Sequence, residues 1–587
     1  MSIQNNFPAI RPSLNLDFAN VKALDPRITF TRAASAVYYD GKTVAKAEEN
    51  LLLRSQEFDN GSWNKTAATV SANTTTAPDG TTTADVFTAT ATGASGCSQS
   101  ITTGAIPHTF SVFAKAGTCS WVRLFSVGGT NAVWFDLTNG VVGTVQGTTT
   151  AAIQSVGNGW YRCSVTSSVG GSTAFIRLAN ADASTDATNA TTLELWGAQL
   201  EQRSAVTAYT PTTTQAITNY VPVLLTAASG VARFDHNPTT GESLGLLVEE
   251  QRTNLVTYSE QFDNADWVKS NSSITANTIV APDGTLTGDK QIPANGVTGT
   301  YVAQAIASTS GVTYTYSVYV KAGELTSFRL LGESGIFGSN QAGNYDLSTG
   351  TASVVSGTPI VSMTAVGNGW YRCVLTAAAT ASTTGGVQQR IVLTGDGYSG
   401  IFIWGAQLEA GAFPTSYIPT VASQVTRAAD AASMTGANFS SWYRADEGTF
   451  YIESVKNGNI SFQQLININD GTISNQIAFG FGSGFYPLRE DITANGISQA
   501  SVVAISDTTT LGLTLKIAGA YRINDFAVSG NGDAVTTDTT GILPAVNQMG
   551  IGFRTVSTPF IYTGTIRRIS YYPKRLSNVE LQGLTTS

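Results

Sequence analysis

The sequence predicts an all-β protein made of tandem β-sandwich domains, and three observations support this. Short segments alternate apolar and polar residues, as in "TFSVFAKAG" (109–117) and "YTYSVYVKAG" (314–323), a pattern that buries one face of an antiparallel strand. The 58 Gly and 17 Pro residues supply tight turns between such segments. No long segment has the apolar period of an amphipathic helix.

One short helix is expected at "LSNVELQGL" (576–584). Ser577 is placed to cap its first turn. Glu580, three residues later, completes the pattern of a capping box.

Length and charge limit the possible functions. A chain of 587 residues is too long for one hydrophobic core, so three or four domains are expected. The net charge is −8, and no run of Lys or Arg suggests a nucleic-acid partner. The start has no apolar signal-peptide core, and no apolar run reaches 18 residues. We therefore expect synthesis in the cytoplasm and no membrane insertion.

The organising feature is a long internal repeat. The stretch "VGNGWYRC" occurs at 156–163 and again at 366–373. Other blocks recur in the same order: "NLLLRSQEFDNGSW" (50–63) with "NLVTYSEQFDNADW" (254–267), "SVFAKAG" (111–117) with "SVYVKAG" (317–323), and "WGAQLE" at 196–201 and 404–409. The offset drifts between 204 and 210 residues, as expected of two copies of one domain that differ in their loops.

The repeat predicts the domain boundaries. The expected units are an N-terminal segment (1–48), jelly-roll domain 1 (49–218), connecting strands (219–250), jelly-roll domain 2 (251–423) and a different β-sandwich (424–587). "FTRA" (30–33) and "VTRA" (425–428) look like one edge motif used twice.

Residues that both copies share are expected to be structural. In "VGNGWYRC", alternation points Tyr161 and Cys163 inward and leaves Trp160 and Arg162 on the other face, stacked on one another. The remaining shared tryptophans and their aromatic neighbours are expected to fill the sandwich cores or seal their ends. The shared set is Trp63 and Trp267, Trp160 and Trp370, Trp196 and Trp404, Cys163 and Cys373, Phe58 and Phe262, and Tyr209 and Tyr417.

The four cysteines do not indicate a disulfide scaffold in so long a chain. Cys163 and Cys373 are expected to be buried free thiols. Cys97 and Cys119 occur only in the first copy, and a bridge between them stays open at this point.

The motifs resemble those of a known class of proteins. The repeat blocks, from "NLLxxSxxF" to "WGAQLE", resemble the carbohydrate-binding-module-like jelly rolls of tailed-phage virion proteins, and "GLLVEEQRTNL" (245–255) resembles the connecting strands beside them. The final "GTIRRISYYPKRLSNVELQGL" (564–584) resembles the last strand and helix of concanavalin A-like, laminin-G-like lectin domains.

This resemblance implies a tail fibre, tail spike or head fibre on the virion surface. It also implies a homotrimer that attaches to other virion proteins through residues 1–48. The jelly rolls would form a shaft and the lectin-like sandwich a tip. Whether the protein sits on the head or the tail is left open.

No catalytic motif is evident, so the protein is not expected to be an enzyme. The only histidines, His108 and His236, lie in no metal-binding or triad pattern. We therefore expect adhesion to host-surface polysaccharide. The alternatives are a structural decoration or spacer that binds no sugar and, third, a polysaccharide depolymerase.

Glycan contacts are sought where the two copies differ. Trp121 aligns with Ser327 and Trp134 with Asn344, so these tryptophans are candidate sugar platforms if they are exposed, with packing or subunit contact as the alternative. Tyr398, in the loop "TGDGYSG", is a weaker candidate.

A turn in the last domain is the candidate metal site. In "NINDGTISN" (467–475), Asp470 and Asn475 offer oxygen ligands for Ca²⁺. No other cofactor is expected.

Overall fold

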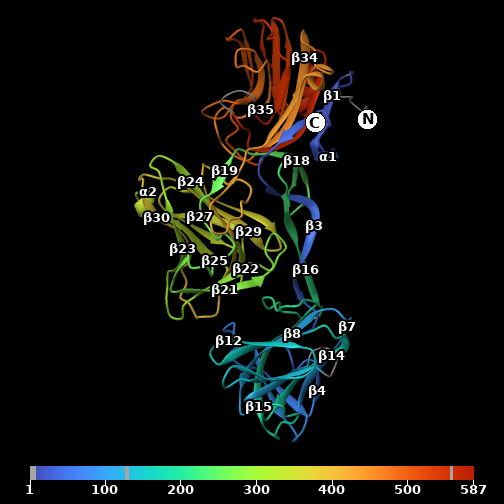
Figure 1. Ribbon diagram of the computed structural model, residues 1–587, viewed down its shortest axis with the longest axis vertical. Coiled ribbons are helices and arrows are strands. Elements are labelled where there is room, and N and C mark those ends of the chain that lie inside the picture. Colours follow the sequence, from blue (N-terminus) through green and yellow to red (C-terminus); the bar gives the residue numbers. More distant parts are fainter. Residues whose placement is uncertain (1–7, 9, 126–130, 555–559, 587) are drawn as a thin grey trace.

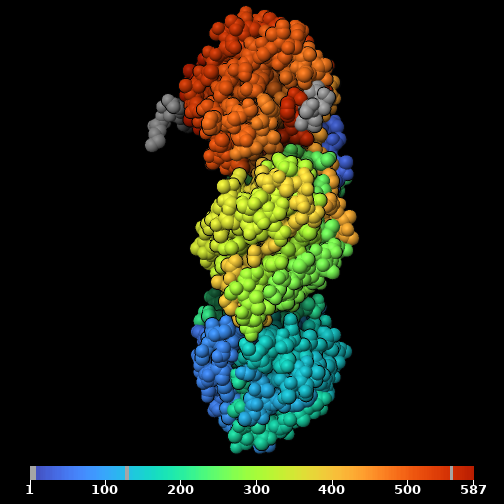
Figure 2. Space-filling view, turned by 90° about the vertical axis from the view of Figure 1, so that its left-hand side faces the viewer, coloured from blue at the N-terminus to red at the C-terminus, as the bar shows by residue number. Residues whose placement is uncertain are grey.

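The computed structural model describes residues 8, 10–125, 131–554 and 560–586. Three β-sandwich units follow one another along the long axis, with the first jelly roll at one end and the terminal sandwich at the other (Figures 1 and 2). Among the described residues, neighbouring strands of every sheet run antiparallel. The predicted all-β class with tandem sandwiches is confirmed.

The first jelly roll packs two six-stranded sheets around one core. Sheet 1A consists, in spatial order, of β11 (Val141–Val145), β10 (Ala132–Asp136), β9 (Trp121–Phe125), β14 (Gly171–Ala179), β7 (Gly96–Thr103) and β4 (Asn64–Thr66). Sheet 1B consists of β12 (Thr150–Gly157), β13 (Trp160–Ser167), β8 (His108–Ala116), β15 (Thr192–Glu201), β6 (Ala84–Ala89) and β5 (Ala68–Thr75).

The second jelly roll repeats this topology strand for strand. Sheet 2A consists of β27 (Thr351–Ser356), β26 (Gln341–Asp346), β25 (Ser327–Gly332), β30 (Thr384–Ile391), β23 (Thr300–Ala307) and β20 (Val268–Ser270). Sheet 2B consists of β28 (Ile360–Gly367), β29 (Trp370–Ala378), β24 (Thr313–Ala322), β31 (Ile401–Ala410), β22 (Gly288–Pro293) and β21 (Ser272–Ile279). The second copy also contains the short helix α2 (Ser334–Phe337), between β25 and β26.

The terminal sandwich has an eight-stranded and a seven-stranded sheet. The larger sheet contains β17 (Arg233–His236), β18 (Ser243–Val248), β43 (Gly564–Tyr572), β34 (Glu447–Lys456), β39 (Thr514–Arg522), β40 (Asp525–Gly530) and β41 (Thr536–Asp538), with β1 (Leu14–Asp17) beside β43. The smaller contains β2 (Thr29–Thr31), β33 (Ala431–Thr435), β42 (Gln548–Ile551), β35 (Gln464–Asn469), β36 (Gln476–Phe481), β37 (Leu488–Ala494) and β38 (Ile497–Ile505). Three helices accompany it: α1 (Phe18–Val21), α3 (Ala437–Ser440) and α4 (Asn578–Thr586).

The described part of the N-terminal segment is not a separate unit, and this corrects the expected boundary. Leu14 and Leu16 alternate inward and are 1% and 2% exposed in the core of the terminal sandwich, where β1 pairs with β43. β2 pairs with β33 of the same unit. The connecting strands β17 and β18 join it as well. Burial of these apolar residues explains why strands so distant in sequence assemble together.

A long two-stranded ribbon joins the units. It consists of β3 (Ala36–Asn50) and β16 (Ile217–Ala227) and runs between the first jelly roll and the terminal sandwich (Figure 1). Apolar side chains of the ribbon, among them Tyr39 and Val221, pack on the outer face of sheet 2B. A second short pair, β19 (Arg252–Asn254) with β32 (Val425–Arg427), closes the junction.

The predicted C-terminal helix and its capping box are confirmed. The backbone N–H of Ser577 donates to Oε2 of Glu580 at 2.7 Å. The N–H of Glu580 donates in return to Oγ of Ser577 at 3.4 Å.

All four cysteines are free and buried. Cys97 and Cys119 are therefore not bridged, and the prediction of buried thiols at Cys163 and Cys373 is confirmed. Burial raises the pKa of the Cys97, Cys163 and Cys373 thiols, so these groups remain protonated at neutral pH.

Candidate functional site

The two "VGNGWYRC" stretches form equivalent hairpin turns. Asn158 and Asn368 occupy the left-handed region, with φ of 51° and 49°, between β12 and β13 and between β28 and β29. Cys163 and Cys373 point into the cores, as predicted. The stretch is therefore a scaffold element in both copies.

The expected stacking of Arg162 on Trp160 is wrong. The guanidinium of Arg162 lies 5.1 Å from the ring centre of Phe113, and Lys115 lies over Trp160 at 5.9 Å. The Trp160 indole N–H instead donates to the Thr76 carbonyl at 3.0 Å. The face assignment was right, but the cross-strand neighbours of β8 supply the stacking partners.

Shared tryptophans occupy two different places. Trp63 and Trp267 lie in the sandwich cores, as predicted. Trp196 and Tyr209 do not, because they join Trp160 in a second aromatic cluster on the outer face of sheet 1B. The equivalent cluster of the second copy, on the outer face of sheet 2B, contains Trp370, Trp404 and Tyr417 and is covered by the ribbon. The expectation that this second set fills the cores is corrected accordingly.

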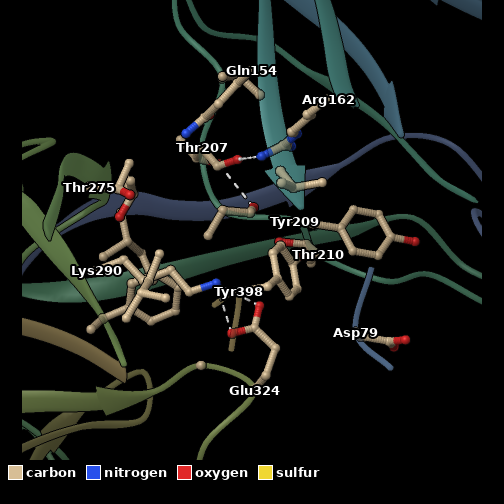
Figure 3. A pocket seen from close by; sticks show the side chains of 18 of the residues that line it. Asp79, Gln154, Arg162, Thr207, Tyr209, Thr210, Thr275, Lys290, Glu324 and Tyr398 are labelled. Atoms are coloured by element: carbon tan, nitrogen blue, oxygen red, sulfur yellow. Dashed lines mark hydrogen bonds and ion pairs between the residues drawn. The ribbon is translucent and has the colours of Figure 1, made fainter. Parts of the chain in front are cut away.

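A cavity of about 750 Å³ opens where the first copy's outer cluster faces the second copy. Sheet 1B and the ribbon form one wall, and the edge of sheet 2B with the loop at Tyr398 forms the other. Figure 3 shows Gln154, Arg162, Thr207 and Tyr209 on one side and Lys290, Glu324 and Tyr398 on the other. A cavity of this size suits a small organic ligand rather than a few waters.

Three residues of the second copy form a connected group in this wall. The Lys290 ammonium lies 4.4 Å from the ring centre of Tyr398 and 2.8 Å from Oε2 of Glu324. Glu324 also accepts a hydrogen bond from the Gly400 N–H at 3.1 Å. Desolvation and the nearby Glu324 carboxylate raise the pKa of the Tyr398 hydroxyl, so this half-buried phenol stays neutral and can donate a hydrogen bond.

The opposite wall is held by the repeat motif. Arg162 donates to the Thr207 carbonyl at 2.6 Å and to the Ser111 hydroxyl at 3.1 Å. Thr207 in turn donates its N–H to the Glu201 carboxylate at 3.1 Å. Burial raises the pKa of the Glu201 carboxyl. The hydrogen bonds from Thr207 and the charge of Arg162 partly offset this increase. These contacts fix the wall, and Gln154 remains on it as an amide able to both donate and accept.

Every cation in the cavity wall has a partner within the protein. Lys290 pairs with Glu324. Lys321 pairs with Glu48 of the ribbon. Among the described residues, Arg162 donates hydrogen bonds only to the neutral Thr207 carbonyl and Ser111 hydroxyl, and its Nε is buried without a partner. The wall therefore combines aromatic rings, amides and hydroxyls with two paired lysines and one arginine held by neutral groups.

The two tryptophan candidates lie elsewhere, on the outer face of sheet 1A. Trp134 is 0% exposed, and its indole N–H donates to the Ser184 carbonyl at 2.6 Å. Since a sugar platform needs an exposed ring, this prediction for Trp134 is wrong: the loop that contains Ser184 covers it. Trp121 is half-buried beside it and keeps part of its surface open.

Asp470 and Asn475 meet, but as a turn and not as a metal site. Oδ1 of Asp470 accepts from the N–H and the hydroxyl of Thr472 at 2.9 and 2.6 Å, and Oδ2 accepts from the Asn475 amide at 2.9 Å. The Asn475 oxygen accepts from the Asn495 N–H at 3.0 Å. In the described ranges, no group of three or more His, Cys, Asp or Glu is arranged to hold a metal ion. The oxygens of this turn are used internally, so they do not fit the Ca²⁺ site that the sequence suggested.

Among the helices of residues 8, 10–125, 131–554 and 560–586, none is long and apolar enough to cross a membrane.

Comparison with known proteins gives matches among solved structures. No protein-family model matches the sequence, and no curated protein matches it. Among solved structures, the CBM40 carbohydrate-binding module of the Ruminococcus gnavus IT-sialidase is 14% identical, with a TM-score of 0.21, over 24% of this chain and 84% of that one. The same module bound to α2,6-sialyllactose is 16% identical, with a TM-score of 0.22 over the same shares.

A tandem pair of modules also matches. The N-terminal CBM22-1–CBM22-2 tandem of Paenibacillus barcinonensis Xyn10C is 13% identical, with a TM-score of 0.19, over 62% of this chain and 99% of that one. Similarity at these TM-scores carries no conclusion about the function of this chain.

Sequence reasoning found Tyr398 but missed its two partners. Lys290 aligns with Val86 and Glu324 with Thr118, so both are differences between the copies, which is the signal that singled out Tyr398. A comparison restricted to aromatic residues does not reveal them. That Arg162 lines the cavity could not be inferred, since the same motif at Arg372 lies under the ribbon-covered face of the second copy.

Proposed function

We propose that the protein is a non-enzymatic adhesion protein that binds neutral host-surface polysaccharide in the cavity between its two jelly rolls. The observation that carries the proposal is the composition of this cavity. Tyr398 and Tyr209 offer rings for the apolar faces of sugars, and Gln154 and neighbouring hydroxyls offer hydrogen bonds. Because both lysines of the wall are already paired with carboxylates, an uncharged sugar fits better there than an acidic one.

Binding to a panel of neutral oligosaccharides, such as maltohexaose, cellohexaose and mannohexaose, tests the proposal by calorimetry. Tyr398→Ala is expected to weaken binding about tenfold, the loss of one stacking contact. Tyr220→Ala is the control, because this ribbon tyrosine is 55% exposed and lies outside the cavity. Absence of binding to every neutral glycan, or equal binding by Tyr398→Ala, contradicts the site.

The proposed location is the surface of a phage virion, as a fibre or spike. The support is the resemblance of the "WGAQLE" and "GLLVEEQRTNL" blocks to phage structural proteins. The described N-terminal strand β1 and the C-terminal helix α4 both belong to the terminal sandwich (Figure 1). We therefore propose that this end attaches to other virion proteins, as a homotrimer, and that the jelly rolls project toward the host. This reverses the expected order of shaft and tip. Antibody labelling of residues 49–218 on particles, seen by electron microscopy, tests it.

A structural spacer is the second candidate function. The ribbon and the buried ion pairs at the junction favour it, because they fix three units in one elongated arrangement (Figure 2). A spacer predicts no binding to any host strain by the purified chain. Loss of polysaccharide viscosity on incubation with the protein contradicts both non-enzymatic candidates.

A further inference from the structure

A pair of arginines lies on the outer face of sheet 1A, on the opposite side of the sandwich from the cavity. Arg123 on β9 and Arg177 on β14 are direct cross-strand partners. Both guanidinium groups lie against one ring, 4.0 Å and 5.5 Å from the centre of Phe125. Trp134 lies 4.3 Å from Arg123, and Phe175 lies 5.2 Å from Arg177.

Neither arginine has an anionic partner among the described residues. No ion pair or hydrogen bond involves either guanidinium, and Nε of Arg123 is buried without a partner in a side chain that is only 7% exposed. The acidic residues that flank Trp121 are engaged elsewhere: Asp136 with Asn139 at 2.7 Å, and Asp182 with Thr144 at 2.7 Å.

This arrangement has an electrostatic cost. Burial and the charge of Arg177 lower the pKa of Arg123 to about 10, so the Arg123 guanidinium still carries a charge at neutral pH. A buried charge without a counterion destabilises the fold unless something pairs with it. A bound anion would remove this cost, and arginine can hold a carboxylate through two parallel hydrogen bonds.

The second copy has the same two arginines, and there each guanidinium donates a hydrogen bond within the protein. Nε of Arg329 donates to the side-chain oxygen of Asn344 at 2.8 Å, where the first copy has Trp134. Arg390 donates to the Gly299 carbonyl at 3.2 Å. In the first copy, Trp134 stands in place of the acceptor Asn344, and neither guanidinium donates a hydrogen bond to a described residue.

The face is accessible at its centre. Arg177, Phe175 and Trp121 are each half-buried. Gly96, the partner of Arg177 on β7, adds no side chain beside it. The open surface therefore combines a cation with two partly exposed rings, the groups that hold a charged sugar by its carboxylate and its apolar face.

We infer that this arginine–aromatic face, formed by Trp121, Arg123, Phe125, Trp134, Phe175 and Arg177, is a second glycan site, specific for sugars that carry a carboxylate. Arg177 binds the carboxylate, Arg123 adds its charge from behind, and Phe175 and Trp121 contact the sugar ring. The site is separate from the cavity and does not depend on the function proposed for it.

The test compares a galacturonate hexasaccharide with its methyl ester, which has the same sugar rings without the charge. The full-length wild type is expected to bind the acid at least tenfold more tightly, with affinity that falls as salt rises. Arg177→Gln is expected to remove this preference, and Arg177→Lys to restore part of it. Arg390→Gln, at the equivalent position of the second copy, is the matched control and is expected to bind like the wild type.

Three results with the acid and its ester overturn the inference. They are equal affinity for the acid and the ester, an unchanged preference in Arg177→Gln, and an equal loss in Arg390→Gln. Competition by inorganic phosphate at the same concentration as the hexasaccharide also overturns it, because it shows a general anion site. Tyr398→Ala is expected to keep the preference for the acid over the ester. The test of this face is therefore independent of the test of the cavity.

Discussion

Arg233 and Asp430 form an ion pair of 2.6 Å in which the two side chains are 0% and 1% exposed. Asp430 also pairs with Arg32 at 3.0 Å, and Arg233 with Glu249 at 2.8 Å. Arg427 completes the network by contacting Glu249. These five residues come from the N-terminal segment, the connecting strands and the start of the last domain. The junction of the terminal sandwich with the rest of the molecule is thus built on buried charge.

Removing one acid from this network is expected to be costly. Asp430→Asn leaves the buried Arg32 without its ion-pair partner and Arg233 with Glu249 alone, and we expect about 3–5 kcal/mol less stability. Glu57→Gln is the control, because its pair with Arg54 is largely exposed and should contribute under about 1 kcal/mol. Denaturant unfolding measures both. Equal effects of the two substitutions would show that the network adds nothing to stability.

The same network predicts sensitivity to acid. Burial alone would raise the pKa of Glu249, but Arg427 and Arg233 lower it to about 2. Since the pKa in the folded state lies below the ordinary value of 4.5, the carboxylate adds stability above pH 4.5 and loses it as the pH falls toward 2. We expect the melting temperature to fall over this range, and to fall less steeply in Glu249→Gln. A parallel decrease in both proteins would rule out Glu249 as the cause.

The sequence signalled parts of this junction without revealing its chemistry. The matching "FTRA" and "VTRA" stretches contribute Arg32 and Arg427. What looked like an edge motif therefore places one buried arginine at the junction in each of its two occurrences. The repeat likewise predicted two equal jelly rolls, because strand alternation is a local property of the chain. The pairing of β1 and β2 with the terminal sandwich joins residues 400 or more positions apart, and no local pattern encodes it.

Site residues were harder to predict than the fold, for a physical reason. Whether an aromatic ring is exposed depends on loops packed over it, as Ser184 shows for Trp134. Comparing the two copies located Tyr398 because a difference between equivalent domains marks a departure from scaffold. The same comparison, extended to charged residues, also marks Lys290 and Glu324.

The tryptophans of the two "VGNGWYRC" stretches are expected to stabilise the fold rather than to bind glycan. Trp370→Ala removes a ring that is 0% exposed and packs beneath the ribbon, so we expect a loss of about 3–5 kcal/mol. Trp160→Ala is expected to have a comparable effect in the first jelly roll. Circular dichroism with thermal melting measures the loss. A soluble variant with an unchanged melting temperature that had lost glycan binding would contradict the structural role.

Asn158 and Asn368 occupy the same position in the two "VGNGWYRC" copies, but their structural surroundings differ. The Asn368 amide donates to both carboxylate oxygens of Glu48, at 3.0 and 2.9 Å, and the ribbon approaches so closely that a Cβ on Gly367 would lie 2.5 Å from Pro222. Asn158, in the first copy, is exposed. Both asparagines have left-handed backbone, so replacing either by Ala costs the same local strain. Asn368→Ala should therefore exceed Asn158→Ala by the value of the hydrogen bonds to the charged Glu48, about 1.5–3 kcal/mol. Denaturant unfolding of the two variants measures this difference. Equal losses would show that the ribbon is held by its apolar contacts alone, and that Glu48 serves only to pair with Lys321.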